Sequence, residues 1–281
     1  MKIHAIQTGS VRIKTAQIAG RGRGLRRRLG VLVDRNWSGW LPTYAWVIEH
    51  QEGVTVVDTG QGTHLLENGR SWHPYHRWEV LFRLEREQEI GPQLRALGIG
   101  PRDVKRVVLT HLHVDHDGGL AHFPQTEILV SRGELRTARG WMGRARGYLP
   151  QRWPSWFDPT ALDLDAGPFG PFAASARLTR AGDLLAVATP GHTAHHLSVI
   201  AMDRDAAYFL AGDTSYTEPL MRAGTVDGVS PDEQVAARTL AAIRRFATER
   251  RVVYLPTHDP ESANRLRPAV SYSANRTPTR S

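Results

Sequence analysis

The feature that most constrains this chain is the stretch from Leu109 to Gly119, in which three histidines and an aspartate fall within six residues. These four are His111, His113, Asp115 and His116. The apolar run Val107-Val108-Leu109 predicts a buried strand just before them. The first two histidines point to one side of an extended chain, and the other two donors come where Asp117-Gly118-Gly119 turns it. This spacing indicates a metal site, and two ions fit it better than one.

A histidine taken alone is more often a solvated or core residue than a ligand. Four possible ligands in six residues at a strand end argue against that explanation here. Imidazole and carboxylate donors suit zinc, manganese or iron better than copper(I). The chain has no cysteine, so any metal must be held by His, Asp or Glu.

Length and composition predict an ordinary globular protein. With 281 residues, 41% of them hydrophobic and 23% charged, we expect one domain spanning residues 1–281. The N-terminus lacks the apolar core of a signal peptide, and no apolar run approaches the length of a membrane span. We therefore expect a cytoplasmic protein without a membrane partner.

The net charge of +8 raises the question of a nucleic-acid partner. Most of the excess is explained by two runs of arginine, in a Gly-rich segment at 20–30 that we predict to be a loop and in the C-terminal region. They comprise Arg21, Arg23, Arg26, Arg27 and Arg28, then Arg265, Arg267, Arg276 and Arg280. No aromatic residues interleave with either run, so we expect no nucleic-acid partner. Residues 268–281 are predicted to be a flexible tail.

Alternating short strands and helices indicate an α/β layered fold. Strands are predicted at 3–18 and 30–34, on either side of the Arg/Gly loop. Several further His and Asp residues each come directly after a short apolar strand. A layered sheet would therefore bring them to the same edge as the first motif. They are Asp58, His192, Asp213 and His258.

A looser segment, 140–172, is rich in aromatic residues among Pro and Gly. It is interpreted as a lid or wall of a substrate pocket, with packing onto the body as the equal alternative. The candidate pocket residues are Trp141, Tyr148, Trp153, Trp156 and Phe157.

Taken in order, these motifs resemble the metallo-β-lactamase superfamily. The run Thr110 to His116 matches its signature, with Asp58-Thr59-Gly60 upstream and Thr189-Pro190-Gly191-His192, Gly212-Asp213 and His258 downstream. The resemblance covers roughly residues 30–260. It implies an α/β fold, a four-layer αβ/βα sandwich with the metals at one edge.

Within that superfamily the chain is most similar to the N-acyl-homoserine lactonases, the quorum-quenching enzymes. Those lactonases place a tyrosine three residues after the bridging aspartate, and Tyr216 stands there. The resemblance implies a metal held by His111, His113 and His192, a second held by Asp115, His116 and His258, and Asp213 between them. Asp58 and His196 correspond to supporting residues that are not ligands.

The implied chemistry is hydrolysis of a lactone ring. Two divalent cations, zinc first with cobalt, manganese or iron as alternatives, would lower the pKa of a bridging water and give a hydroxide that attacks the ester carbonyl. Tyr216 would donate a hydrogen bond to the developing oxyanion or to the substrate's amide, and Asp115 would pass a proton to the leaving alkoxide. The aromatic segment and the Arg/Gly loop would flank the acyl chain.

Other reactions of the same superfamily stay open. A glyoxalase II-like thioester hydrolase would use the same seven ligands, and a phosphotriesterase or arylesterase activity is a credible side reaction. A β-lactamase is less favoured because the cysteine ligand of its best-known members is absent. A nuclease would need a large insertion for RNA that the chain lacks. A monomer and a homodimer are both compatible with the sequence.

Overall fold

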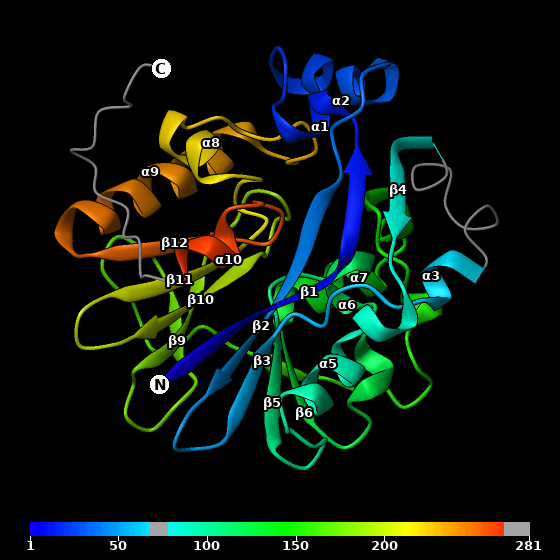
Figure 1. Ribbon diagram of the computed structural model, residues 1–281. Helices are drawn as coiled ribbons and strands as arrows, with labels where there is room; N and C mark the ends of the chain where they lie inside the picture. The colour runs from blue at the N-terminus through cyan, green and yellow to red at the C-terminus, as the bar shows by residue number, and fades with distance from the viewer. Residues whose placement is uncertain (68–77, 267–281) are drawn as a thin grey trace.

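The computed structural model describes residues 1–67 and 78–266. Two β-sheets pack face to face, and helices cover the outer face of each sheet (Figure 1). The layers therefore run helix, sheet, sheet, helix, which confirms the predicted four-layer αβ/βα sandwich. The predicted flexible tail, 268–281, lies outside the described residues.

The first sheet has seven strands in the order β4-β1-β2-β3-β5-β6-β7. Its N-terminal half is antiparallel, whereas β3, β5, β6 and β7 run parallel to one another. In sheet order, the strands are β4 (Val80–Arg83), β1 (Lys2–Ile13), β2 (Leu41–Glu49), β3 (Val54–Val57), β5 (Val104–Leu109), β6 (Glu127–Ser131) and β7 (Thr160–Leu162).

The second sheet has five strands in the order β12-β11-β10-β9-β8. Only the β11–β12 pair is parallel. In sheet order, the strands are β12 (Val252–Pro256), β11 (Ala207–Gly212), β10 (Leu197–Met202), β9 (Leu184–Ala188) and β8 (Ser175–Arg177).

Helices connect these strands and cover the sheets. The α-helices are α1 (Thr15–Ile18), α2 (Gly24–Val33), α3 (His64–Glu67), α5 (Ile90–Ala96), α6 (Val114–Asp117), α7 (Arg132–Arg139), α8 (Glu218–Ala223), α9 (Glu233–Glu249) and α10 (Ser262–Arg265). Short 3-10 turns lie at Arg86–Gln88, Leu120–His122, Arg144–Arg146 and Pro150–Arg152.

Alternation along β2 shows how the sandwich is held together. Tyr44, Trp46 and Ile48 belong to the apolar cluster between the two sheets, whereas Ala45 and Val47 belong to the cluster under α5. A strand with both faces covered has a nearly continuous apolar sequence, and this one is buried over most of its length. Burial of a side chain such as Trp46, 1% exposed, contributes about 2–3 kcal/mol.

The Arg/Gly segment differs from the sequence prediction, because most of it is the helix α2 and not a loop. The predicted strand at 30–34 is wrong for the same reason, and β1 ends at Ile13. Arginine and leucine favour helix, and burial of one side of the segment against the body outweighs the cost of its glycines. Arg27 and Val31, one turn apart, are buried against the body, whereas Leu25, Leu29 and Leu32 lie along another face.

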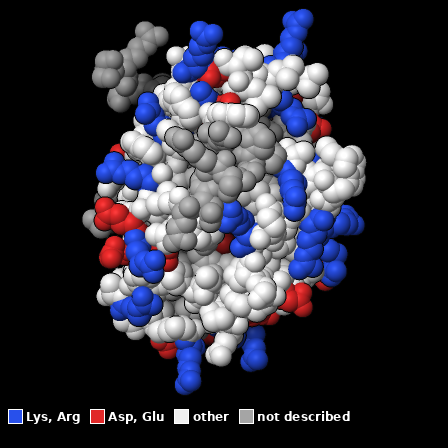
Figure 2. All heavy atoms as spheres, turned by 90° about the vertical axis from the view of Figure 1, so that its right-hand side faces the viewer, with Lys and Arg blue, Asp and Glu red and all other residues white. Residues whose placement is uncertain are grey.

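Figure 2 shows Lys and Arg side chains spread over one face of the molecule rather than gathered in a single stripe. No helix within residues 1–67 and 78–266 combines the length and the apolar composition that crossing a bilayer requires.

Candidate metal centre

Side chains from four segments of the chain converge beside the ends of both sheets. Three groups of His and Asp donors form there, each with its ligand atoms within 4.8 Å of one another. The groups are His111 with His113 and His192, His111 with His116 and Asp213, and Asp115 with His116 and His258. Together they contain all seven donors named from the sequence.

The topology explains this convergence. The end of β5 delivers His111 and His113, and the short helix α6 turns Asp115 and His116 back toward them. The other donors come after the last residues of β9, β11 and β12, and they are His192, Asp213 and His258. Polar groups at the ends of neighbouring strands meet at one edge, as in other layered α/β proteins.

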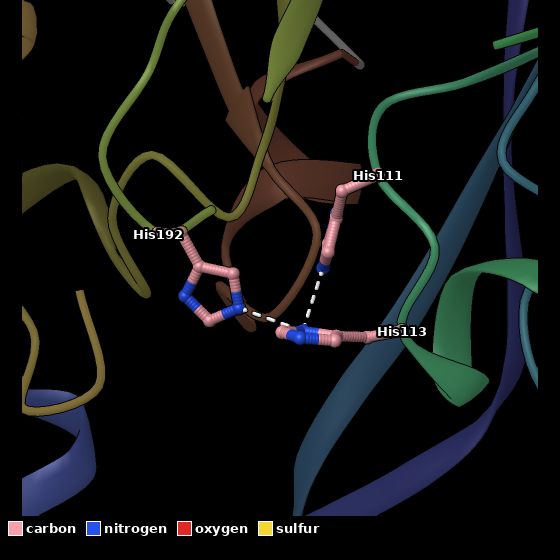
Figure 3. A group of neighbouring side chains, drawn as sticks. All are labelled: His111, His113 and His192. Carbon is pink, nitrogen blue, oxygen red and sulfur yellow. Dashed lines mark hydrogen bonds between the residues drawn. The ribbon is translucent and has the colours of Figure 1, made fainter. Parts of the chain in front are cut away.

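The first group is a compact set of imidazole nitrogens. His113 Nδ1 lies 3.1 Å from His111 Nε2 and 3.1 Å from His192 Nε2. Figure 3 shows the three rings directed toward one another, with His111 and His113 on the segment that follows β5 and His192 on a different loop. Three nitrogens facing one point form one side of a tetrahedral site with an open position.

Asp213 lies between the two halves of the centre. Its Oδ1 is 3.3 Å from His116 Nε2 and 3.4 Å from His258 Nε2, and its Oδ2 is 3.5 Å from His192 Nε2. Asp115 Oδ2 lies 3.4 Å from the same His258 nitrogen. One carboxylate thus lies close to His192 of the first group and to His116 and His258 of the group that contains Asp115.

The protonation states fit metal ligands. Burial, reinforced by neighbouring imidazoles, holds the pKa of His111 well below its ordinary value and lowers that of His113 to about 3. Both rings are therefore neutral near pH 7, the form that binds a metal. Burial opposes ionisation of Asp213, but the charges of His258 and His116 outweigh it and hold the carboxyl pKa well below its ordinary value.

The same centre attracts positive charge. Burial disfavours the charged form of His258, yet Asp213 and Asp115 raise its pKa to about 10. His116 Nε2 and Asp213 Oδ1 are also buried without a hydrogen-bond partner among the described residues, an arrangement that is costly unless a further group satisfies them. Oriented nitrogens, buried carboxylate oxygens and these two orphaned atoms fit divalent cations.

Asp58 supports the centre from the end of β3. Its Oδ2 accepts hydrogen bonds from His116 Nδ1 at 2.9 Å and from the Thr110 hydroxyl at 2.9 Å, and its Oδ1 accepts from Thr110 N at 2.8 Å. Among the described residues other than glycine, only Asp58 has a positive φ, 59°. Such a backbone costs about 1–3 kcal/mol and persists where its surroundings enforce it.

His196 lies behind the donors. Its Nε2 accepts a hydrogen bond from the backbone N–H of Asp213 at 3.1 Å, and its Nδ1 is 2.9 Å from the Thr189 hydroxyl. Gly212 leaves room for this ring, because a Cβ there would lie 2.5 Å from His196 Nε2. The ring therefore orients Asp213 through its backbone.

Two further supports were missed by sequence reasoning. Asp227 Oδ2 is 3.0 Å from His192 Nδ1, and the Pro42 carbonyl is 2.9 Å from His258 Nδ1. Acceptors of this kind fix the tautomer and direct Nε2 toward a metal. Neither residue lies in a recognisable motif, so only the folded structure reveals them.

A cavity of about 470 Å³ opens over the centre. Tyr216 and Tyr148 line it, together with His113, Asp115, His192, Asp213 and His258. The Tyr216 ring stacks on His258, with centroids 5.5 Å apart and an interplanar angle of 24°, and is only 2% exposed. A phenol therefore faces the same space as the metal donors.

Of the five aromatic residues expected to line the pocket, only Tyr148 does so. Trp141 is 91% exposed and Trp156 is 37% exposed. Trp153 packs edge-on against Phe157 and donates a hydrogen bond from Nε1 to Asp117 Oδ2 at 2.7 Å. The alternative, packing onto the body, describes these last two residues, because Phe157 belongs to the apolar cluster under α5 and Trp153 packs against that cluster.

The apolar wall of the cavity comes instead from the N-terminal region. The helix α2 contributes several leucines that are exposed to this space, and β1 and β4 contribute the adjoining surface. These residues are Leu25, Leu29 and Leu32, then Val11, Ile13, Val80 and Phe82. The Arg/Gly segment thus flanks the cavity as expected, but as one side of a helix.

Comparison with known sequences and structures agrees with this geometry. The chain is 25% identical over 286 residues to an N-acyl homoserine lactonase AttM of Agrobacterium fabrum, covering 98% of this chain and 99% of that one. A structure titled as an N-acyl homoserine lactone hydrolase with N-hexanoyl-L-homoserine bound at its catalytic metal center superposes with a TM-score of 0.75 at 20% identity, covering 94% and 95% of the chains.

A second solved structure, titled as the dizinc quorum-quenching lactonase AidC, gives a TM-score of 0.63 at 15% identity over 92% of this chain and 87% of that one. The model of the metallo-beta-lactamase superfamily matches residues 38–258, a span that contains every donor described above. With that match over most of its length, the sandwich fold and the His/Asp clusters, the chain belongs to the metallo-beta-lactamase superfamily.

Proposed function

We propose that this protein is a dinuclear metal-dependent hydrolase that opens the lactone ring of N-acyl-homoserine lactones. One ion would be held by His111, His113 and His192, and the other by Asp115, His116 and His258, with Asp213 between them. Zinc suits this donor set, and cobalt, manganese or iron could use the same ligands. When bound, the ions supply Lewis acidity for the ester carbonyl and a water of lowered pKa.

The protein's own residues orient the substrate and manage its charge. Tyr216 donates a hydrogen bond to the carbonyl oxygen as negative charge develops on it, or to the substrate's amide. Asp115 lines the cavity, takes one of the two protons of the attacking water and passes it to the ring oxygen as the ester C–O bond breaks, while the other proton is released. The products are a carboxylate, a free hydroxyl group and one released proton.

The observation that carries this proposal is the position of Tyr216, whose phenol shares the cavity with Asp213 and Asp115. The apolar surface formed by α2, β1 and β4 offers a place for an aliphatic acyl chain, which a neutral lactone needs for binding because it has no charge to exploit. Relatives named N-acyl homoserine lactonases give independent support.

The test is proton release, followed with a pH indicator, from butyryl-, hexanoyl- and decanoyl-homoserine lactones. Protein of measured metal content is compared with protein treated with a chelator and with chelated protein reloaded with zinc. We expect turnover that disappears on chelation and returns with about two zinc ions per chain. His122→Gln is a control, since His122 pairs with Glu89 outside the centre.

A glutathione thioester, nitrocefin and paraoxon are tested as alternative substrates under the same conditions. Efficient thioester cleavage without lactone turnover would replace the proposal by a glyoxalase II-like activity. Paraoxon hydrolysis alone would favour a phosphotriesterase. One bound ion with full activity would contradict the dinuclear centre.

A further inference from the structure

We propose that Gln17 is a positioning residue for Tyr216, and that it determines the direction in which the phenol donates its hydrogen. This inference rests on the proposed function, in which Tyr216 donates to the substrate. Gln17 Nε2 donates a hydrogen bond to Tyr216 Oη at 2.9 Å, although the two residues are 199 positions apart. Both side chains are buried and both line the cavity.

Gln17 has a rigid backbone setting. Its N–H donates to the Lys14 carbonyl at 2.9 Å, and its own carbonyl accepts from Gly228 N at 2.8 Å. Asp34 holds the preceding turn, accepting from the Thr15 hydroxyl at 2.8 Å and from Ala16 N at 2.7 Å. The side-chain amide is therefore presented to Tyr216 from a fixed position.

The contact with Gly228 permits no side chain. A Cβ at that position would lie 2.1 Å from the Ala16 carbonyl. The loop around Gly228 also carries Asp227, which contacts His192, and Arg27 of α2 hydrogen-bonds to the Asp227 and Ser230 carbonyls. The turn that holds Gln17 is thus tied to a loop that supports the metal donors.

Because of the geometry of a phenol, this contact determines the direction of the Tyr216 hydroxyl hydrogen. The hydroxyl hydrogen prefers one of two directions in the plane of the ring, and the oxygen accepts along the other. Stacking on His258 fixes the plane of the Tyr216 ring. When Gln17 donates into one of these directions, the hydrogen of Tyr216 is directed to the opposite one.

A double-mutant cycle tests this inference, with Gln17→Met as a near-isosteric change that removes the donor. We expect kcat for hexanoyl-homoserine lactone to fall about 5- to 10-fold with KM unchanged within about 2-fold, because the lost interaction acts mainly in the transition state. Tyr216→Phe should lower kcat by about 10- to 100-fold, toward the lower range for loss of one preorganised donor. In that background, Gln17→Met should have no further effect on kcat.

Two further variants complete the double-mutant cycle: a control at another buried glutamine, and a change at Gln17 that replaces the hydrogen-bond donor by an acceptor. Gln61 is another buried glutamine, which donates to the Thr43 hydroxyl at 2.8 Å, so Gln61→Met should change stability while leaving kcat within about 2-fold. Gln17→Glu replaces the donor by an acceptor that draws the phenolic hydrogen toward itself. We expect it to lower kcat at pH 8 at least as much as Gln17→Met.

Nuclear magnetic resonance provides a readout that does not depend on turnover. The side-chain amide protons of Gln17 should exchange slowly with solvent in the metal-loaded parent and at least about 10-fold faster in Tyr216→Phe, since a lost bond of about 1.4 kcal/mol corresponds to that factor. Thermal unfolding and metal content are measured for every variant, so that a misfolded variant is recognised.

The outcomes separate the two proposals. Equal loss of kcat from Gln17→Met in both backgrounds, or a fully active Gln17→Glu, would overturn the role of Gln17 while leaving the lactonase proposal intact. Absence of lactone turnover in the parent would overturn the lactonase proposal. Unchanged exchange of the Gln17 amide in Tyr216→Phe would overturn the pairing whatever the substrate.

Discussion

The metal donors and the N-terminal segment 15–34 face the same cavity, but the chain encodes them in different ways. Each donor comes after a short apolar strand and lies in a motif that can be recognised locally. The N-terminal segment contains no such motif, and it reaches the site through the Gln17–Tyr216 and Arg27–Asp227 contacts over about 200 positions. The chemistry is thus encoded at strand ends, whereas the shape of the cavity depends on long-range packing.

The largest effect is expected from Asp213→Asn, which removes the charge that faces both donor groups. A lost supporting residue typically costs 10–100-fold, so loss of this donor should cost at least about 100-fold in turnover and reduce metal content below one ion per chain. Elemental analysis and lactone turnover measure the two effects. Asp163→Asn, at a surface pair with Arg132, should retain both.

Asp58→Asn should have the next largest effect. Asparagine tolerates the positive φ at this position, so the change isolates the carboxylate that accepts from His116 Nδ1. We expect a loss of about 10- to 100-fold in metal affinity, measured by competition with a chromogenic chelator. An unchanged affinity would show that His116 needs no such partner.

Leu29→Ser tests the wall formed by α2. Each buried methylene contributes about 0.8 kcal/mol, so loss of this apolar contact should lower the ratio of kcat/KM for decanoyl over butyryl lactone by about 5- to 10-fold. Trp141→Ser is the control, because Trp141 is exposed and lies off the cavity. If Trp141→Ser changed this kcat/KM ratio more than Leu29→Ser does, the acyl chain would bind against the aromatic segment and not against α2.

The smallest effect concerns the stability of the N-terminal segment. The Asn36 N–H lowers the pKa of Asp34 from 3.8, burial opposes this, and the Ala16 N–H and Thr15 hydroxyl lower it further. A carboxyl whose folded pKa is below its unfolded pKa stabilises the fold above about pH 4, and this contribution is lost as the pH falls further. Asp34→Asn should therefore cost about 1 kcal/mol at pH 7, or about 2–4 °C in Tm.

Scanning calorimetry at several pH values checks this expectation. The difference in Tm between the parent and Asp34→Asn should shrink as the pH falls from 4 toward 2. A difference that is independent of pH would mean that Asp34 acts through its shape and not its charge.

The sequence by itself determined the layered fold and the convergence of the seven donors. Apolar strands ending in His or Asp are local patterns, and strands that end at one sheet edge bring their terminal residues to the same place. Tyr216 was singled out through the resemblance to the N-acyl-homoserine lactonases, which place a tyrosine three residues after the aspartate that corresponds to Asp213.

Only the tertiary structure decided what surrounds those donors. Of the aromatic side chains in segment 140–172, only Tyr148 lines the cavity, whereas α2 contributes Leu25, Leu29 and Leu32 to its apolar wall. The glycines of α2 led to the prediction of a loop, because glycine disfavours helix. Burial of Arg27 and Val31 against the body outweighs that preference. Gln17 and Asp227 became recognisable only through partners far away in the chain, because packing between distant segments leaves no periodic signal in either of them.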